Sequence, residues 1–126
     1  MKKALVIDDD EIYLELLCIV LSKEGFTVVS TADAPQGVML FEQHRPAIVL
    51  LDLGLPSMSG LEVLKKIRSM DPAAKVIVIT GYGSAESAAA SMRMGAMEFI
   101  EKTADLETMI SKIKTALQRA ERENNP

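Results

Sequence analysis

Acidic side chains follow two separate apolar segments of this sequence. Asp8 and Asp9 come directly after Leu5–Ile7, and Asp52 comes directly after Ile48–Leu51. Two carboxylates about 4 Å apart repel each other by roughly 4 kcal/mol at an effective dielectric constant near 20. If these acids lie together, their charge must be balanced by a raised pKa, by a lysine or by a bound divalent ion.

Two further apolar segments are followed by polar residues, a threonine and a lysine, and the lysine could balance part of this charge. Thr80 ends the segment that begins at Val76, and Lys102 follows Phe99 and Ile100. The acids offer only oxygen ligands, without histidine or cysteine nearby, and this favours a hard metal ion. Because Mg²⁺ keeps several waters and binds through one or two carboxylates plus a phosphate, the small acidic set suits Mg²⁺. The acids are therefore expected to form a magnesium site.

The elements that must position these residues form a regular alternation. Five short apolar segments are separated by longer helical patterns, which predicts repeated β-α units. Several of the segments are apolar on both faces, as in a parallel sheet covered by helices on both sides. We therefore expect an α/β fold, a doubly wound three-layer sandwich. The predicted strands are Leu5–Ile7, Thr27–Val29, Ile48–Leu51, Val76–Ile79 and Phe99–Ile100.

The order of these strands decides whether the acids meet. Ligands of open parallel sheets bind at the carboxyl ends of the strands, at the point where the strand order reverses. In the flavodoxin-like order 2-1-3-4-5, the first and third strands are neighbours, which places Asp8 and Asp9 beside Asp52. Asp10, the next acid in the chain, is most simply a turn or N-cap residue.

The helical patterns have apolar faces and recognisable ends. The first helix, about Glu11 to Glu24, directs Leu16, Leu17 and Val20 toward the sheet. Its flanking apolar residues are either broadly buried or partly shown to a partner, and they are Ile12, Leu14, Ile19 and Leu21. Further helices begin near Asp33, a predicted N-cap, and after Gly60, and another spans about Ser84 to Met94. The last helix, Asp105 to about Arg122, is predicted to bury Leu106, Met109, Ile110, Ile113 and Leu117.

Length and composition restrict the function. The chain has 126 residues, enough for one domain, which we place at 1–122 with 123–126 as a polar tail or the start of a linker. A net charge of −4 disfavours direct nucleic-acid binding. The single cysteine, Cys18, forms no internal disulfide and, like His44, is expected on a helix surface without metal-ligand company. Neither a signal peptide nor a membrane-spanning apolar run is recognisable, which predicts a cytoplasmic protein.

The motifs at the strand ends resemble the receiver domain of two-component response regulators over nearly the whole chain. The matching stretches are Val6-Ile7-Asp8-Asp9-Asp10, Leu50 to Gly60, Val78-Ile79-Thr80-Gly81 and Phe99-Ile100-Glu101-Lys102. The resemblance implies a phosphoacceptor signalling domain and not an enzyme in its own right. Its partner would be a sensor histidine kinase or a phosphotransfer protein, contacted through the first helix and the loops around the site.

The resemblance also implies roles for individual residues. Asp52 would accept the phosphoryl group, with Lys102 and Thr80 contacting its oxygens. Mg²⁺ would be coordinated by Asp9, Asp52 and the backbone carbonyl of Gly54, with Asp8 assisting through water.

Signalling in this family uses a second conformation. Thr80 and the aromatic residue Phe99 would form the switch, and the fourth helix, fifth strand and fifth helix would form the output face. That face could form a homodimer, and an output domain could follow Pro126. The sequence departs from the family where Thr103 replaces the usual cis proline after Lys102, so we expect a trans bond there.

Two other functions share parts of this pattern. A small phosphatase working through an aspartyl-phosphate would carry a second aspartate two residues after the nucleophile, where this chain has Gly54. A flavin-binding module of the same strand order would place a flavin phosphate among three acids, with few aromatic residues to stack its ring.

At the positions that tune phosphoryl lifetime in the family, Gly54 would admit water while Tyr82 could shield the site, so the sequence leaves the lifetime open.

Overall fold

A computed structural model describes residues 2–81, 83–103 and 105–124, in which parallel strands alternate with helices. The strands are β1 (Lys3–Ile7), β2 (Thr27–Thr31), β3 (Ile48–Leu51), β4 (Val76–Thr80) and β5 (Glu98–Glu101). The helices are α1 (Glu11–Lys23), α2 (Ala34–His44), α3 (Gly60–Met70), α4 (Ala85–Arg93) and α5 (Leu106–Asn124). The predicted alternation of strands and helices is confirmed.

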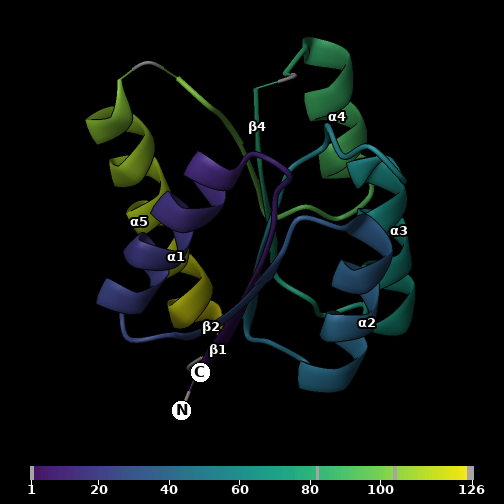
Figure 1. The fold of residues 1–126 in the computed structure, drawn as a ribbon, viewed down its shortest axis with the longest axis horizontal. Coiled ribbons are helices and arrows are strands. Elements are labelled where there is room, and N and C mark those ends of the chain that lie inside the picture. Colours follow the sequence, from purple (N-terminus) through teal and green to yellow (C-terminus); the bar gives the residue numbers. More distant parts are fainter. Residues whose placement is uncertain (1, 82, 104, 125–126) are drawn as a thin grey trace.

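The sheet has the order β2-β1-β3-β4-β5, which confirms the predicted flavodoxin-like topology (Figure 1). β1 and β3 pair directly, with Ile7 opposite Leu51. The N–H of Asp52 donates a 2.9 Å hydrogen bond to the carbonyl oxygen of Ile7. Asp8 and Asp52 therefore leave neighbouring strands at the same level of the sheet.

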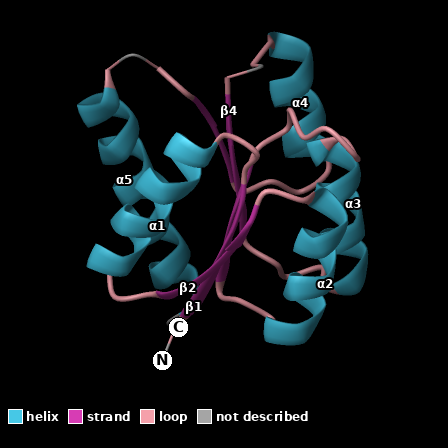
Figure 2. Cartoon of the chain, in the orientation of Figure 1, coloured by secondary structure: helices cyan, strands magenta, loops and turns pink. Residues whose placement is uncertain are grey.

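Helices cover both faces of the sheet, as the doubly apolar strands require (Figures 1 and 2). α1 and α5 lie on one face, and α2, α3 and α4 lie on the other. Every residue of β3 and β4 is buried, and alternate side chains join different core clusters. Leu50 packs in the α1 and α5 cluster, whereas Leu51 packs in the cluster beneath α2 and α3. This double burial makes the central strands a rigid base for the residues that follow them.

The burial of α1 differs in part from the prediction. Leu17 and Val20 are buried as expected, but Leu21, predicted on the flank, is also fully buried, while Leu16 is only half-buried. The helix is therefore turned slightly toward Leu21, which packs with β1 in one core cluster. Cys18, predicted at the helix surface, is half-buried against that cluster and so is less exposed than expected.

Some of the apolar surface of α1 remains uncovered. Ile12 is 79% exposed and Ile19 is 48% exposed. The prediction that α1 has more apolar surface than core packing uses is confirmed for these two residues.

The last helix runs to Asn124, two residues beyond its predicted end. Met109, Ile113 and Leu117 are buried as predicted, but Leu106 is 45% exposed. The first residue of α5 that is buried in the core cluster is Met109, one turn after Leu106, so Leu106 stays exposed to solvent. In the described part of the chain, no helix combines the length and the apolar character needed to cross a membrane.

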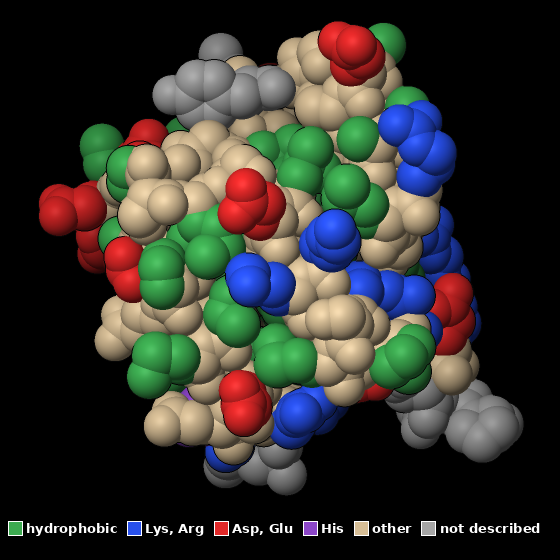
Figure 3. Space-filling model, turned by 90° about the vertical axis from the view of Figure 1, so that its right-hand side faces the viewer, with side chains coloured by type: hydrophobic (Ala, Val, Ile, Leu, Met, Phe, Trp, Pro, Cys, Tyr) green, Lys and Arg blue, Asp and Glu red, His purple; other side chains and the backbone are tan. Residues whose placement is uncertain are grey.

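The outer surface of the α2, α3 and α4 layer is mixed. Figure 3 shows Lys and Arg side chains in a band across this face, with hydrophobic side chains lying between them. Arg45, Lys65, Lys66 and Arg93 are all exposed on this layer, and so is Met39. The acids named in the sequence analysis lie instead at the carboxyl ends of the strands.

Candidate functional site

A cavity of about 640 Å³ opens at the carboxyl edge of the sheet, where the chain leaves β1, β3 and β4. Side chains from the β1–α1 loop, the first turn of α1 and the ends of β3 and β5 reach it. Its lining residues are Asp9, Asp10, Tyr13, Asp52, Gly81 and Lys102.

Asp8 lies beneath this cavity and is only 1% exposed. Its Oδ1 accepts hydrogen bonds from the N–H of Asp10 at 2.9 Å and from Lys102 Nζ at 3.2 Å. Its Oδ2 accepts no hydrogen bond of good geometry from the described residues and is contacted by the Lys102 ammonium as an ion pair. Burial raises the pKa of Asp8 to about 6, although the N–H of Asp10 and the Lys102 ammonium act in the opposite direction. Asp8 is therefore a carboxylate whose negative charge is incompletely compensated by the protein.

Asp52 is also buried, at 2% exposed, but its carboxylate receives more stabilising contacts from the protein than that of Asp8 does. Burial raises the pKa of Asp52. Hydrogen bonds from the Gly54 N–H and from Thr80, together with the Lys102 ammonium, lower the pKa by a larger amount, so the net shift is downward. The Gly54 N–H donates to Asp52 Oδ1 at 3.1 Å. Asp52 is consequently held ionised at neutral pH, which is the state that a nucleophilic carboxylate needs.

Lys102 joins the two acids. Its Nζ lies 2.9 Å from Asp8 Oδ2 and 3.1 Å from Asp52 Oδ2, and its side chain is 10% exposed. Burial lowers the pKa of Lys102, but the two carboxylates raise it by more, so the ammonium stays charged. No cis peptide bond occurs among the described residues, so the bond to Thr103 is trans as expected, and Lys102 reaches both acids with it.

Three carboxylates lie together as predicted. One oxygen from each of Asp8, Asp9 and Asp52 falls within 4.8 Å of the others. Asp9 is exposed at the cavity, whereas the other two are buried. Three negative charges beside one ammonium leave an excess of negative charge, and the same ammonium is shared between Asp8 and Asp52. These observations fit a site for a hard divalent cation.

Local sequence determines how Asp52 is presented. Ser59 caps α3, its Oγ accepting from the N–H of Glu62 at 3.2 Å, and Gly60 begins the helix. A Cβ at Gly60 would lie 2.4 Å from the backbone oxygen of Asp52 and 2.4 Å from the Cα of Leu53. Only glycine allows α3 to approach the end of β3 this closely.

The remaining residues named from the sequence are placed as follows. Asp10 is the N-cap of α1, as predicted, and its Oδ1 accepts from the N–H of Ile12 at 3.0 Å. Thr80 is fully buried at the end of β4 beside Asp52.

Phe99 is half-buried against the α2 and α3 core cluster and lines a separate groove of about 350 Å³ between β5 and α5. Tyr82 lies outside the described residues, so the structure leaves its predicted shielding of the site untested.

One lining residue was not predicted from the sequence. Helical periodicity assigns Tyr13 to the sheet-facing stripe of α1, but its ring also forms part of the cavity wall. The Nζ of Lys102 lies 4.4 Å from the centroid of this ring. The available signal was the position of Tyr13 in the first turn of the helix that follows the acidic loop.

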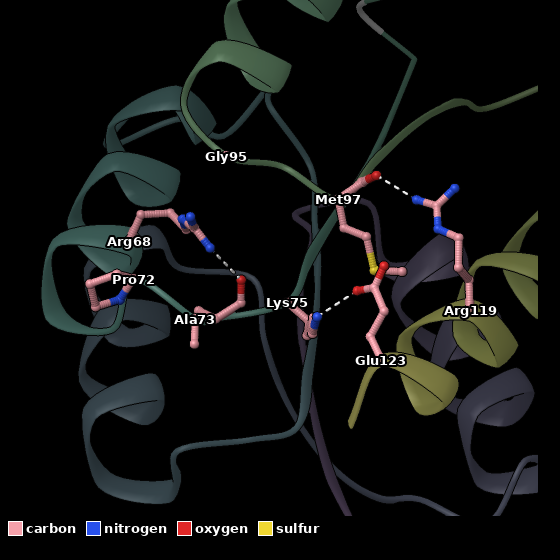
Figure 4. A pocket seen from close by; sticks show the side chains of 9 residues that line it. Arg68, Pro72, Ala73, Lys75, Gly95, Met97, Arg119 and Glu123 are labelled. Atoms are coloured by element: carbon pink, nitrogen blue, oxygen red, sulfur yellow. Dashed lines mark hydrogen bonds and ion pairs between the residues drawn. The ribbon is translucent and has the colours of Figure 1, made fainter. Parts of the chain in front are cut away.

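A second cavity, of about 520 Å³, lies at the opposite edge of the sheet, between α3 and α5 (Figure 4). Its cations already have partners. Arg68 donates to the carbonyl oxygen of Ala74 at 2.9 Å, Arg119 donates to that of Met97 at 2.7 Å, and Lys75 pairs with Glu123. These contacts hold the loops before β4 and β5 and the end of α5 in place. The charged residues of the second cavity are therefore best explained as stabilising the fold.

The fold and the acidic site together define a doubly wound α/β domain with an acidic cluster at the carboxyl edge of its sheet. Residues 4–114 match the response regulator receiver domain family. The chain is 32% identical over 116 residues to sporulation initiation phosphotransferase F of Bacillus subtilis, covering 92% of this chain and 94% of that protein.

Solved structures agree with this match. A CheY-like receiver domain protein from Methanospirillum hungatei has a TM-score of 0.85 and 34% identity, with 98% of each chain covered. The CheX-CheY-BeF3-Mg²⁺ complex from Borrelia burgdorferi has a TM-score of 0.84 and 28% identity, covering 94% of this chain and 87% of that one.

The chain belongs to the response regulator receiver domain family, and it is a phosphoacceptor signalling domain of the two-component type. Some curated relatives named as regulatory proteins are longer, and the chain spans 49% and 56% of two of them.

Proposed function

We propose that Asp52 accepts a phosphoryl group from a phosphohistidine on a sensor histidine kinase or phosphotransfer protein. The observation that carries this proposal is the contrast between the two buried acids. Asp52 has a lowered pKa and is partnered by Lys102, Thr80 and the Gly54 N–H, whereas the pKa of Asp8 is raised. Asp52 is thus the ionised oxygen nucleophile at the floor of an open cavity.

In the proposed transfer, an Asp52 carboxylate oxygen attacks the phosphorus atom of the donor. The P–N bond breaks as the P–O bond forms, and its electron pair returns to the imidazole nitrogen. Lys102 turns from Asp52 toward a phosphoryl oxygen, and the Thr80 hydroxyl donates to another. Because a carboxylate is a weak nucleophile toward an anionic phosphoryl group, these groups act by positioning and by neutralising charge.

The residues that would hold Mg²⁺ are Asp9, Asp52 and the backbone carbonyl of Gly54, with Asp8 assisting through water. The acidic cluster, whose three carboxylates share one ammonium, supports this assignment, and a similar structure was determined with BeF3 and Mg²⁺. When bound, the ion supplies charge neutralisation for the carboxylates and the phosphoryl oxygens.

The conformational response is proposed for Thr80 and Phe99. Thr80 moving toward a phosphoryl oxygen would vacate space at the end of β4, and the half-buried Phe99 could swing inward. Val78 pairs with Phe99 in the sheet, and Thr80 pairs with Glu101, so the two switch residues lie on adjacent strands. The output face would then be α4, β5 and α5.

The partner surfaces follow from the same arrangement. The exposed Ile12 and Ile19 on α1, together with the loops around the cavity, suit a kinase or phosphotransfer protein. The α4, β5 and α5 face could support a homodimer, and an output domain could follow Pro126 in a longer protein. Membership of the family supports a cytoplasmic regulatory module and not an independent enzyme, and a net charge of −4 argues against direct nucleic-acid binding.

The alternatives are less well supported. A phosphatase would use a second acid two residues after Asp52, and that position is the half-buried Gly54. A flavin phosphate would meet the acidic cluster at the switch point. Turnover of phosphate monoesters or a yellow purified protein would reopen these readings.

The direct test is phosphorylation by acetyl phosphate in the presence of Mg²⁺. Intact mass should increase by one phosphoryl group in the wild type and in Asp33→Asn, a matched acid-to-amide change at the N-cap of α2. Asp52→Asn should show no gain. A gain that persists in Asp52→Asn would refute the assignment of the phosphoacceptor.

A further inference from the structure

The ring of Tyr13 forms one wall around the Lys102 ammonium. The Nζ atom lies 4.4 Å from the ring centroid, within the range of a cation–π contact. Tyr13 is half-buried in the first turn of α1, and its side chain also packs against the α1 and α5 core cluster. The ring is therefore held by the core on one side while its face meets the lysine.

The contacts of Lys102 leave a defined role for this ring. An ammonium has three N–H donors, and the carboxylates of Asp8 and Asp52 lie on two sides of it at 2.9 Å and 3.1 Å. The aromatic face offers negative electrostatic potential on a further side, where water would otherwise compete for the ammonium. The side chain of Lys102 is only 10% exposed in this enclosure.

A ring suits a lysine that must change partners. Hydrogen bonds to Asp52 are directional, so they break when Lys102 turns to a phosphoryl oxygen. A cation–π contact depends mainly on the charge lying over the ring face, so it persists through a small turn. Tyr13 can thus keep the ammonium over the site before and during transfer.

We propose that Tyr13 is a positioning residue for phosphorylation, holding the Lys102 ammonium where it meets the incoming phosphoryl group. The inference rests on the proposed function of Asp52 and extends it to a residue of α1. Because the contact is made by the face of the ring, the phenolic hydroxyl is not needed, and phenylalanine at this position should support phosphorylation equally well.

The test compares initial rates of phosphorylation of the full chain by phosphoramidate with Mg²⁺, followed by intact mass. Tyr13→Leu should lower the maximal rate about three- to tenfold, the size expected for a partly desolvated cation–π contact. Tyr13→Phe should stay within about twofold of the wild type, because cation–π strength is similar for the two rings. Tyr13→Met repeats the deletion with a longer apolar side chain, and urea unfolding checks that each variant is folded.

A matched control exists elsewhere in the molecule. Phe26 is also half-buried against the α1 and α5 cluster, and Lys2 Nζ lies 4.7 Å from its centroid, away from the acidic site. Phe26→Leu removes a comparable ring and should leave the rate unchanged. Slowing by Phe26→Leu equal to that by Tyr13→Leu would overturn the inference, because it would reveal a general effect of losing a ring.

A double-mutant cycle shows whether Tyr13 acts through Lys102. In a Lys102→Met background, Tyr13→Leu should cause no further slowing, whereas an equal slowing in both backgrounds would overturn the inference. If the wild type itself gains no phosphoryl group, the proposed function fails. In that case, ¹⁵N NMR of the Lys102 ammonium tests the inference. Exchange of the ammonium protons with solvent should be slow in the wild type and in Tyr13→Phe, and fast in Tyr13→Leu.

Discussion

At the scale of single residues, the site is an unequal distribution of stabilising contacts between two buried acids. Asp52 receives N–H and O–H donors in addition to Lys102, whereas Asp8 receives one N–H and shares the same ammonium. One lysine cannot fully stabilise both carboxylates, so their pKa values move in opposite directions. The protein thus keeps a nucleophile ionised by accepting an energetic cost at its neighbour.

This cost predicts that Asp8→Asn stabilises the fold when divalent ions are chelated. The unfolded acid ionises near its ordinary pKa of 3.8, but the folded acid ionises only near about 6. Between these values, raising the pH ionises the unfolded state alone and so favours unfolding; above about pH 6 the cost is constant. The free energy of unfolding of Asp8→Asn should exceed that of the wild type by about 3 kcal/mol near neutral pH, at 1.36 kcal/mol per pKa unit.

Urea unfolding in EDTA, at about pH 4 and about pH 7.5, measures this difference. The gain should be small at the lower pH, where Asp8 is protonated in the folded state. Asp33→Asn is the control for the substitution itself, because asparagine is an equally good N-cap. A difference between Asp8→Asn and the wild type that is independent of pH would contradict the explanation.

The residues of the site were predictable to the extent that strand ends converge. The acids after β1 and β3 and the lysine after β5 could be located because parallel strands end at one edge. The cation–π partner of Lys102 could not, since the periodicity of α1 assigns Tyr13 to the core and a ring can serve both purposes. The difference in pKa between Asp8 and Asp52 also depends on individual N–H directions that no sequence pattern reports.

At the scale of elements, the sequence predicted helix beginnings better than strand ends. Asp10, Asp33 and Ser59 each accept a backbone N–H at the start of a helix, in the first two cases as predicted. β2 continues through Ser30 and Thr31, beyond its predicted end. These polar residues belong to an edge strand, where pairing with β1 alone sustains the strand without an apolar side chain.

The junction between β3 and α3 predicts a sharp response to one added methyl group. Gly60→Ala should lower the free energy of unfolding by about 1 to 3 kcal/mol, as in other overpacked sites, because the new Cβ would clash with the backbone of Asp52 and Leu53. The clash should also displace Asp52 and slow its phosphorylation. Chemical denaturation and the acetyl phosphate assay measure the two effects.

Gly81→Ala provides a matched change for stability. A Cβ at Gly81 would find its nearest neighbour, Lys102 Cδ, at an ordinary 3.9 Å. This variant should therefore remain close to the wild type in its midpoint of unfolding. Equal midpoints for Gly60→Ala and Gly81→Ala would show that the close approach at α3 is less restrictive than the geometry indicates.

At the scale of the whole molecule, the sheet separates two cores while its carboxyl edge concentrates negative charge. The clusters on its two faces hold the strands rigidly, so the acids cannot move apart to relieve their repulsion. The excess charge therefore acts against folding of the entire domain. Any cation that binds the folded cluster and not the unfolded chain must raise global stability.

This linkage predicts that Mg²⁺ stabilises the wild-type domain by an amount set by its concentration. The expected gain in the free energy of unfolding is about 1.4 kcal/mol at ten times the dissociation constant and about 2.7 kcal/mol at a hundred times. Denaturant titrations at constant ionic strength, with Na⁺ replacing Mg²⁺, separate specific binding from screening of the net charge of −4. In Asp9→Asn the dependence on Mg²⁺ should weaken strongly although Asp9 is exposed and its loss costs little packing. An equal response of the wild type and Asp9→Asn would mean that the ion stabilises the domain from somewhere other than the acidic cluster.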